Sequence, residues 1–137
     1  MMNRATKSNL TWQKAPEIKK ALKEVLGLVE LPHVKLSRIY TYRSFGSTSR
    51  SYARIWSFPK IFQDALGLEP AYVIEVLAKY YDRLSYDEQM KVLIHELLHI
   101  PKNFSGALLP HRTNGRQLDK LADQLFREYK QSLKLKT

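Results

Sequence analysis

The 137-residue sequence contains no cysteine, which excludes a disulfide framework and any metal site built on thiolate ligands. A metal ion in this protein would therefore have to be held by nitrogen and oxygen atoms. No apolar run approaches the roughly 20 residues of a membrane-spanning helix, and the first residues, Met-Met-Asn-Arg-Ala-Thr-Lys, lead into no apolar signal segment. We expect a cytoplasmic protein with no membrane partner.

The chain is too short for two hydrophobic cores. Its 137 residues, 44% of them hydrophobic, suffice for one core. We therefore expect a single domain over residues 1–137, in which residues 1–33 form an N-terminal helical extension and residues 34–137 form the core.

Acidic residues are scarce in the first part of the chain. Residues 1–60 contain 12 Lys and Arg against 3 acidic residues, whereas residues 61–137 contain 11 against 10. A basic surface of this kind is typical of proteins that bind polyanions, although lysine-rich helix faces are often only solvated. Arg43, Arg50 and Arg54 alternate with aromatic and hydroxyl residues, so nucleic-acid contact through this basic half is one hypothesis.

The segment His95-Glu96-Leu97-Leu98-His99 is an HExxH motif, the signature of zinc hydrolases. In a helix, His95 and His99 lie one turn apart on the same face and can reach a single metal ion. Glu96 is rotated by about 100° from His95. It can therefore approach a metal-bound water as a general base without being a ligand.

The residues around the motif predict a helix. Ser85 and Glu88 have the spacing of a capping box, which starts a helix. Pro101 cannot continue a helix and disfavours helical geometry at Ile100, so the helix should end at His99 or Ile100. Apolar residues recur at spacings of three and four and should face the core: Met90, Leu93, Ile94, Leu97 and Leu98. The histidines lie off this stripe, where a shallow cleft could run.

A catalytic zinc ion usually has three protein ligands and one open position for water, so the two histidines need a third partner. His111 is favoured because it follows His99 in a loop rich in turn-forming residues and because imidazole is a preferred zinc ligand. Asp119 or Asp123, from a later helix, is the alternative. His33 follows a proline in a turn and is expected at the surface.

The remaining pattern predicts an α+β fold with a small mixed or antiparallel sheet of about three strands. Helices are expected at residues 16–27 and 60–66 and from about Asn114 onward, with strands at 34–42, 52–58 and 72–77. Residues 77–81 are a further helical candidate, and the serine-rich tract at 44–51 is expected to be a loop that becomes ordered when substrate binds.

Three segments resemble the phage and archaeal metallopeptidase family: Ala53-Arg-Ile-Trp-Ser-Phe-Pro-Lys, Ala71-Tyr-Val-Ile-Glu-Val-Leu and His95-Glu-Leu-Leu-His-Ile-Pro-Lys-Asn-Phe-Ser-Gly-Ala-Leu-Leu-Pro-His111. The resemblance extends from about residue 34 to the C-terminal helix. It implies a minimal zincin-like domain with one zinc ion on His95, His99 and His111, Glu96 as catalytic base and a peptide or protein substrate. The chain is more distantly similar to SprT-like proteases, which act near DNA.

Peptide hydrolysis at such a site needs further groups. Arg112 or Tyr42 could stabilise the oxyanion. The strand at 72–77 could run along the cleft as an edge strand and pair with an extended peptide. The carboxylates expected to orient a ligand imidazole are Glu75, Asp82 and Asp119.

Three other functions remain open from the sequence. The zinc ion could be purely structural in a nucleic-acid-binding protein. The same zinc and glutamate could hydrolyse other amides or esters. The protein could also be a SprT-like protease that acts on DNA-bound proteins.

Overall fold

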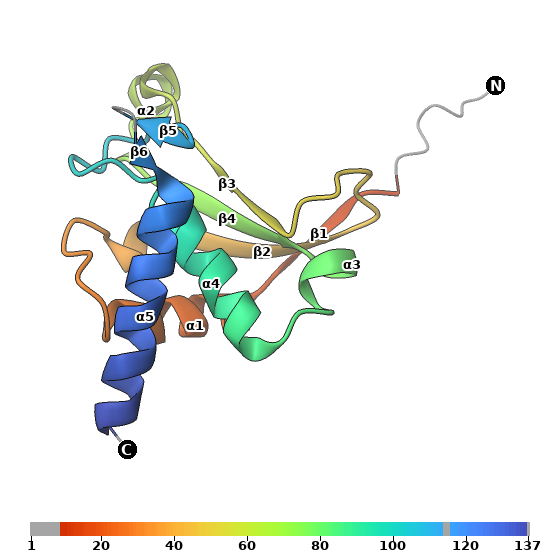
Figure 1. Cartoon of the computed structure of the whole chain (residues 1–137). Coiled ribbons are helices and arrows are strands. Elements are labelled where there is room, and N and C mark those ends of the chain that lie inside the picture. Colours follow the sequence, from red (N-terminus) through yellow and green to blue (C-terminus); the bar gives the residue numbers. More distant parts are fainter. Residues whose placement is uncertain (1–8, 114–115, 137) are drawn as a thin grey trace.

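The computed structural model describes residues 9–113 and 116–136. It confirms the α+β class, with a four-stranded mixed sheet that has α1 and α4 against one face and α5 packed against α4 (Figure 1). The strands of this sheet are β1 (Thr11–Lys14), β2 (Ile39–Phe45), β3 (Ala53–Trp56) and β4 (Tyr72–Leu77). The helices are α1 (Pro16–Leu26), α2 (Lys60–Leu66), α3 (Ala78–Tyr81), α4 (Tyr86–Leu97) and α5 (Leu118–Lys136), with a 3-10 turn at Leu36–Arg38.

The strand order is β1-β2-β4-β3, so β1 and β3 are the two edges of the sheet. The pairing is antiparallel between β1 and β2, parallel between β2 and β4, and antiparallel between β4 and β3. The expectation that residues 72–77 form an edge strand is therefore wrong. Five of the six residues of β4 are buried, which is consistent with its central position between β2 and β3.

The core lies between the sheet and the helices. Alternate strand residues, such as Ile39 of β2 and Ile74 of β4, point toward the helices and are fully buried. Their helical partners include Leu22 of α1 and Leu93 of α4, which belong to the same cluster of buried residues. This packing fixes α4, which carries the HExxH motif, against the sheet.

The N-terminal helix begins and ends as predicted, with Pro16 in its first turn and Gly27 as its C-cap. It is preceded by β1, which the sequence did not predict because its four residues are all exposed and show no apolar alternation. Both elements share the sheet and core of the later residues. The amide of Ala15 donates to the Thr41 carbonyl, and the Thr41 hydroxyl donates to the Ala15 carbonyl.

The capping box at the start of α4 is confirmed. The Ser85 hydroxyl accepts from the Glu88 amide, and the Glu88 carboxylate accepts from the Ser85 amide. The α-helix itself ends at Leu97, slightly earlier than predicted, and a tighter turn continues to Ile100, whose amide donates to the Leu97 carbonyl. His99 lies within that turn.

Other predicted boundaries shift. β2 starts at Ile39 and not at residue 34, because Leu36–Arg38 forms the 3-10 turn, and it ends at Phe45 and not at residue 42, so the expected loop begins later. β3 covers Ala53–Trp56 and not residues 52–58. The short helix α2 has the predicted bounds and ends at Gly67 in the left-handed conformation. The last helix begins at Leu118, and Asn114, where its start was expected, lies outside the described residues.

Candidate metal centre

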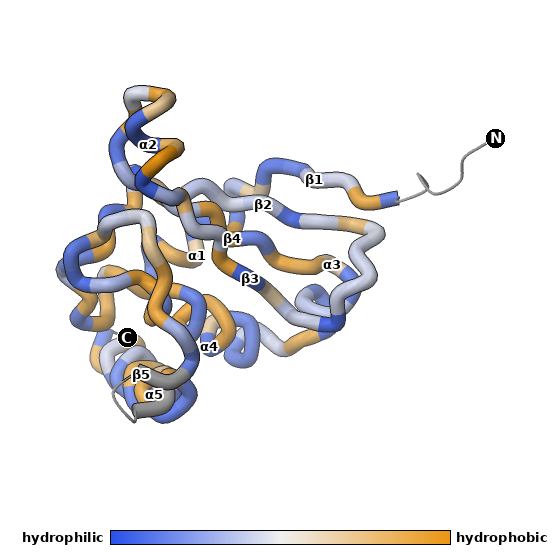
Figure 2. Tube along the Cα trace, turned by 90° about the horizontal axis from the view of Figure 1, so that it is seen from above, coloured by the Kyte–Doolittle hydropathy of each residue, from blue (hydrophilic) through white to orange (hydrophobic). Residues whose placement is uncertain are grey.

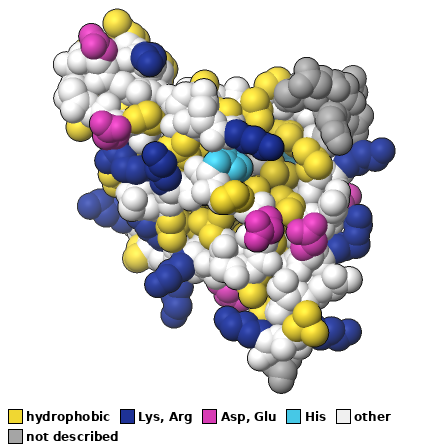
Figure 3. Space-filling model, turned by 90° about the vertical axis from the view of Figure 1, so that its left-hand side faces the viewer, with side chains coloured by type: hydrophobic (Ala, Val, Ile, Leu, Met, Phe, Trp, Pro, Cys, Tyr) yellow, Lys and Arg dark blue, Asp and Glu magenta, His cyan; other side chains and the backbone are white. Residues whose placement is uncertain are grey.

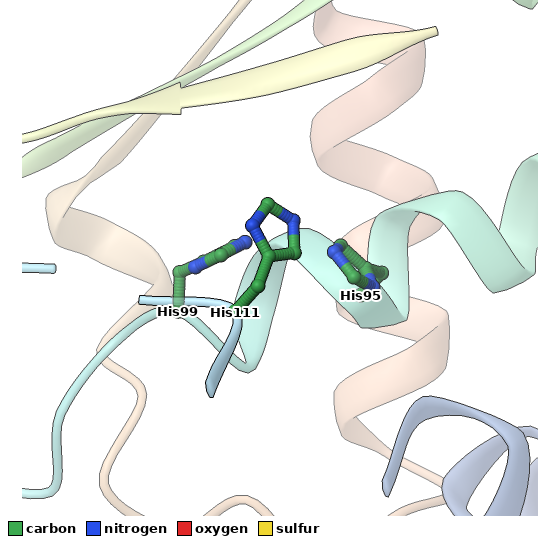
Figure 4. Close-up of side chains that lie close together, drawn as sticks. All are labelled: His95, His99 and His111. Atoms are coloured by element: carbon green, nitrogen blue, oxygen red, sulfur yellow. The ribbon is translucent and has the colours of Figure 1, made fainter. Parts of the chain in front are cut away.

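Three histidines converge at the C-terminal end of α4 (Figure 4). His95 lies in the last turn of the helix, His99 in the turn that follows it, and His111 at the end of the next loop. One ring nitrogen from each lies within 4.8 Å of the others, and the ring centroids are 4.7 to 5.2 Å apart. The structure thus brings together the three residues that the sequence proposed as ligands.

The loop between His99 and His111 is fixed to the centre of the sheet. The Tyr72 hydroxyl of β4 accepts from the Gly106 amide and donates to the Ala107 carbonyl, both at 2.8 Å. The Leu109 amide donates to the His99 carbonyl at 2.7 Å. No sequence pattern indicates this role for Tyr72, because the contact joins residues 34 positions apart.

Gly106 is required for this course of the loop. Its φ is +95°, and a Cβ atom there would lie 2.4 Å from the Phe58 carbonyl oxygen. The Phe58 amide donates to the Gly106 carbonyl, so the loop and the chain before α2 are in direct contact. His33, which was expected at the surface, is instead half-buried, with its Nε2 atom 3.2 Å from the Ile100 carbonyl oxygen.

Each histidine of the motif is oriented through its Nδ1 atom. Nδ1 of His95 lies 3.1 Å from a carboxylate oxygen of Asp119, and Nδ1 of His99 lies 2.6 Å from the Leu109 carbonyl oxygen. An imidazole that donates from Nδ1 presents an unprotonated Nε2 to a metal ion, which is how metal-binding histidines are usually held. The arrangement therefore suits metal binding before any ion arrives.

Of the carboxylates proposed as ligands or orienting groups, one lies beside a histidine and the others are paired with other residues. Asp119 faces His95, whereas Asp123 forms an ion pair with Lys91 at 2.7 Å. Glu75 accepts from Arg54 and Trp56, and Asp82 accepts from Arg43, so the structure contradicts an orienting role for these two carboxylates.

The donor set fits zinc. Burial lowers the pKa values of His95 and His99. Neighbouring imidazoles lower them further: His99 and His111 act on His95, and His111 acts on His99. The neutral imidazole is the form that binds metal. Three neutral nitrogen ligands with a fourth position open to solvent are typical of a catalytic zinc site.

Glu96 is buried, with 8% of its surface exposed. This burial raises the pKa of its carboxyl to about 7, because the charged form loses its hydration. A carboxylate with such a pKa is a stronger base than an exposed glutamate.

An open cleft of about 610 Å³ runs beside His95 and Glu96. On the sheet side, the cleft is lined by residues 51–53, which lead into the edge strand β3. Its other wall is formed by α4 and α5. Figure 3 shows histidine atoms at the surface, beside a Lys or Arg side chain and hydrophobic side chains. The cleft residues of the sheet side, including Tyr52, were missed by sequence reasoning because no motif marks them.

Two residues proposed for the oxyanion are not brought to the histidines by any described contact. Tyr42 lines a hollow with Trp12 and Trp56, on the face of the sheet opposite the helices. Arg112 lies in the short strand β5 (Arg112–Thr113), which pairs with β6 (Arg116–Gln117), and its side chain is outside the described part of the structure.

The three arginines proposed for nucleic-acid contact do not share a surface. Arg43 pairs with Glu17 and Asp82 on the helix side of the sheet, and Arg54 pairs with Glu75 on the other side. Arg50 is exposed in the loop before β3. Because two of the three are engaged with carboxylates, nucleic-acid contact through this trio is not supported.

Comparison with known proteins agrees with the geometry. A sequence model of the family described as "Putative phage metallopeptidase" matches residues 10–134. No curated protein and no solved structure matches the chain.

Proposed function

The chain belongs to the phage metallopeptidase family, and from this premise we propose that it is a zinc-dependent peptidase whose ion is held by His95, His99 and His111. The observation that carries the proposal is the position of Glu96. It lines the same cleft as His95 and the start of the edge strand β3, so a ligand, a base and a surface for extended chain are side by side.

Bound zinc would supply a Lewis acid that polarises the scissile carbonyl and acidifies a water molecule. The residues of the chain do the rest. Asp119 and the Leu109 carbonyl hold His95 and His99 in the tautomer that ligates. Glu96 accepts a proton from the attacking water and passes it to the leaving amine, which is the usual sequence for a general acid and base.

The edge strand β3 is the proposed binding surface for substrate. It pairs only with β4 among the described strands, so its other edge is available for pairing, and its first residue, Ala53, lines the cleft. An extended polypeptide could pair with this edge through its own backbone, largely independently of its side chains. Such a site favours unfolded or exposed segments over compact domains, because only the former can supply a free strand.

The test combines zinc content with cleavage of an unfolded substrate. Purified wild type, Glu96→Gln and His111→Ala would be washed with a mild chelator, analysed for zinc and incubated with reduced, alkylated casein. We expect about one zinc ion per chain in the wild type and in Glu96→Gln, with cleavage at least about 100-fold slower in the latter. His111→Ala should lose both zinc and activity.

Each contrary result has a defined meaning. If Glu96→Gln cleaves as fast as the wild type, Glu96 is not the base and the proposed chemistry is wrong. If His111→Ala keeps its zinc, the third ligand lies elsewhere. Zinc in the wild type without cleavage of any unfolded substrate would contradict the peptidase and leave a structural ion.

A further inference from the structure

The face of the sheet opposite the helices exposes large aromatic rings. Figure 2 shows the four strands of the sheet side by side, in the order β1, β2, β4 and β3. Trp12 of β1, Tyr40 of β2 and Trp56 of β3 are 54%, 44% and 46% exposed, respectively. Burying such rings is one of the largest sources of hydrophobic stabilisation. A row of them left in solvent therefore indicates a binding surface.

Strand register places these rings in order. Tyr40 lies opposite Val73, which lies opposite Trp56, so two rings flank a small side chain. Tyr42, two residues further along β2, has Lys14 on one side and Glu75 on the other. Residues two apart on a strand share a face. The rings and the lysine thus form one continuous surface, which we call the aromatic face.

Two hollows divide the aromatic face. One, of about 300 Å³, is lined by Arg38, Tyr40 and Trp56 among others. The second, of about 470 Å³, lies between Trp12, Tyr42 and Trp56. Trp56 is common to both, so its ring stands between two spaces, each of which is bordered by a further aromatic ring.

The charge of the aromatic face is positive. Across β1 to β4 the only carboxylate is Glu75, and this group is fully buried and neutralised by Arg54. Lys19 lies beside a ring, 5.7 Å from the Tyr40 ring centroid, and Arg38 lines one of the two hollows. Arg54, 5.3 Å from the Trp56 ring centroid, adds no net charge because it is paired with Glu75. Lys14 lines a hollow together with Tyr40 and Lys19.

We propose that the aromatic face binds single-stranded nucleic acid. Unpaired bases would stack on the rings of Trp12, Tyr40 and Trp56, and phosphates would be neutralised by Lys14, Lys19 and other cations at the rim. Sheet surfaces with exposed rings and flanking cations suit this ligand, because every base has a flat face and the backbone carries regular negative charge. An acidic, base-free polymer would use the cations and leave the rings unused.

The aromatic face and the metal centre are on opposite sides of the same sheet. The histidines lie on the helix side, and β3 contributes to both, with Trp56 on the aromatic face and Ala53 in the cleft. Nucleic acid and an extended polypeptide could therefore be held at the same time. The binding proposal does not depend on the peptidase proposal.

The test is fluorescence anisotropy of a labelled 15-nucleotide oligothymidylate with the full chain. Trp12→Ala and Tyr40→Ala are each expected to weaken binding about 5- to 100-fold, the range for loss of one base–aromatic stack. Phe62→Ala is the matched control, since Phe62 is 52% exposed on α2, outside the aromatic face, and should bind as the wild type. Lys14→Gln should reduce the salt dependence of log Kd by about 0.7.

The outcomes separate the possibilities. Weaker binding by both ring variants, with Phe62→Ala and Glu96→Gln unaffected, supports the proposal, and a labelled oligouridylate shows whether RNA or DNA is preferred. Equal affinity for a duplex of the same length overturns it, because a duplex offers no free bases to stack. No binding at low salt also overturns it, as does a concentration-dependent dimer that Trp12→Ala abolishes, which would make the aromatic face a contact between copies of this chain.

Discussion

At the scale of single residues, the two histidines of the motif differ in what holds them. His99 is oriented by a backbone carbonyl, which no substitution removes, whereas His95 depends on the Asp119 side chain. The carboxylate of Asp119 is 79% exposed, so it contributes little to the packing of the domain. Its contribution to metal affinity can therefore be measured separately from stability.

Asp119→Asn is expected to weaken zinc affinity about 10- to 100-fold, the usual effect of removing a partner that orients a ligand imidazole. The measurement is competition for zinc with a chromophoric chelator. Asp123→Asn is the matched control, because Asp123 lies on the same helix and pairs with Lys91 and not with a histidine. Equal zinc affinity in wild type and Asp119→Asn would show that the contact with His95 is incidental.

Gly106→Ala is expected to lower the free energy of unfolding by about 2 kcal/mol or more, because it combines a positive φ with a clash against backbone atoms of Phe58. Zinc affinity should fall with it, since the loop leads to His111. Urea unfolding and zinc titration provide the measurement. Gly67→Ala has a similar φ but no atom within 4 Å. Gly67→Ala should lower the free energy of unfolding by only about 1 kcal/mol. A larger loss for Gly67→Ala than for Gly106→Ala would contradict the claim that the clash with Phe58 makes Gly106 necessary.

At the scale of elements, β3 and β4 are joined by an ion pair between Arg54, which is partly exposed, and Glu75, which is buried. Arg54 and Trp56 donate to the Glu75 carboxylate at 2.9 and 2.8 Å. Burial alone would raise the pKa of Glu75, but the hydrogen bonds and the charge of Arg54 lower it below its ordinary value. A lowered carboxyl pKa stabilises the folded state above the ordinary value, near 4.5, and this stabilisation disappears as pH falls through the folded-state pKa.

The stability difference between wild type and Glu75→Gln should therefore shrink as pH falls from 6 to below 4. Urea unfolding at a series of pH values measures it. At neutral pH, Arg54 has a charged carboxylate to pair with only in the wild type. Glu75→Gln should therefore be less stable than the wild type at neutral pH. A difference that is independent of pH, or that grows in acid, would be contrary to the pairing seen in the structure.

The elements could be predicted where the signal is local. The capping box of α4, the first proline of α1 and the apolar run of β4 all lie within the element that they specify. β1 carries no such signal, since its exposed residues are strand only because β2 pairs with them. The edge or central position of β4 likewise depends on which strands lie beside it, and that is decided by the rest of the chain.

The part of the candidate site that lies within one helix could also be predicted from local sequence. His95, Glu96 and His99 lie within one helix turn, so their relative placement follows from helix geometry. Only the choice between His111 and a carboxylate needed the fold. The roles of Tyr72, the Leu109 carbonyl and Asp119 were not determined by spacing, because each depends on how a loop returns to the sheet.

At the scale of the whole molecule, the three histidines connect α4 to the loop that follows it. A zinc ion bound to all three would stabilise the folded state over the unfolded chain by mass action, by about 2.7 kcal/mol at a free concentration 100 times the Kd. We expect a rise in Tm of roughly 10 °C for a domain of this size.

Thermal unfolding of the apo protein with and without added zinc checks this coupling. His111→Ala should reduce the shift in Tm strongly, while magnesium should produce none in either protein, since it prefers oxygen ligands. An equal zinc-induced shift in wild type and His111→Ala would show that the ion binds elsewhere on the folded domain. The described part of the chain has no helix able to span a membrane.

The free edge of β3 has a consequence for the protein's own lifetime. A surface that accepts any extended backbone does not distinguish a foreign chain from an unfolded copy of the same sequence. If β3 binds substrate as proposed, folded molecules can bind and cleave unfolded copies of the same chain. Warming would then make thermal unfolding irreversible, because the unfolded molecules are digested. The amount of intact protein would then fall fastest near the melting temperature, where folded and unfolded molecules are both abundant. Removal of the metal ion would prevent this loss.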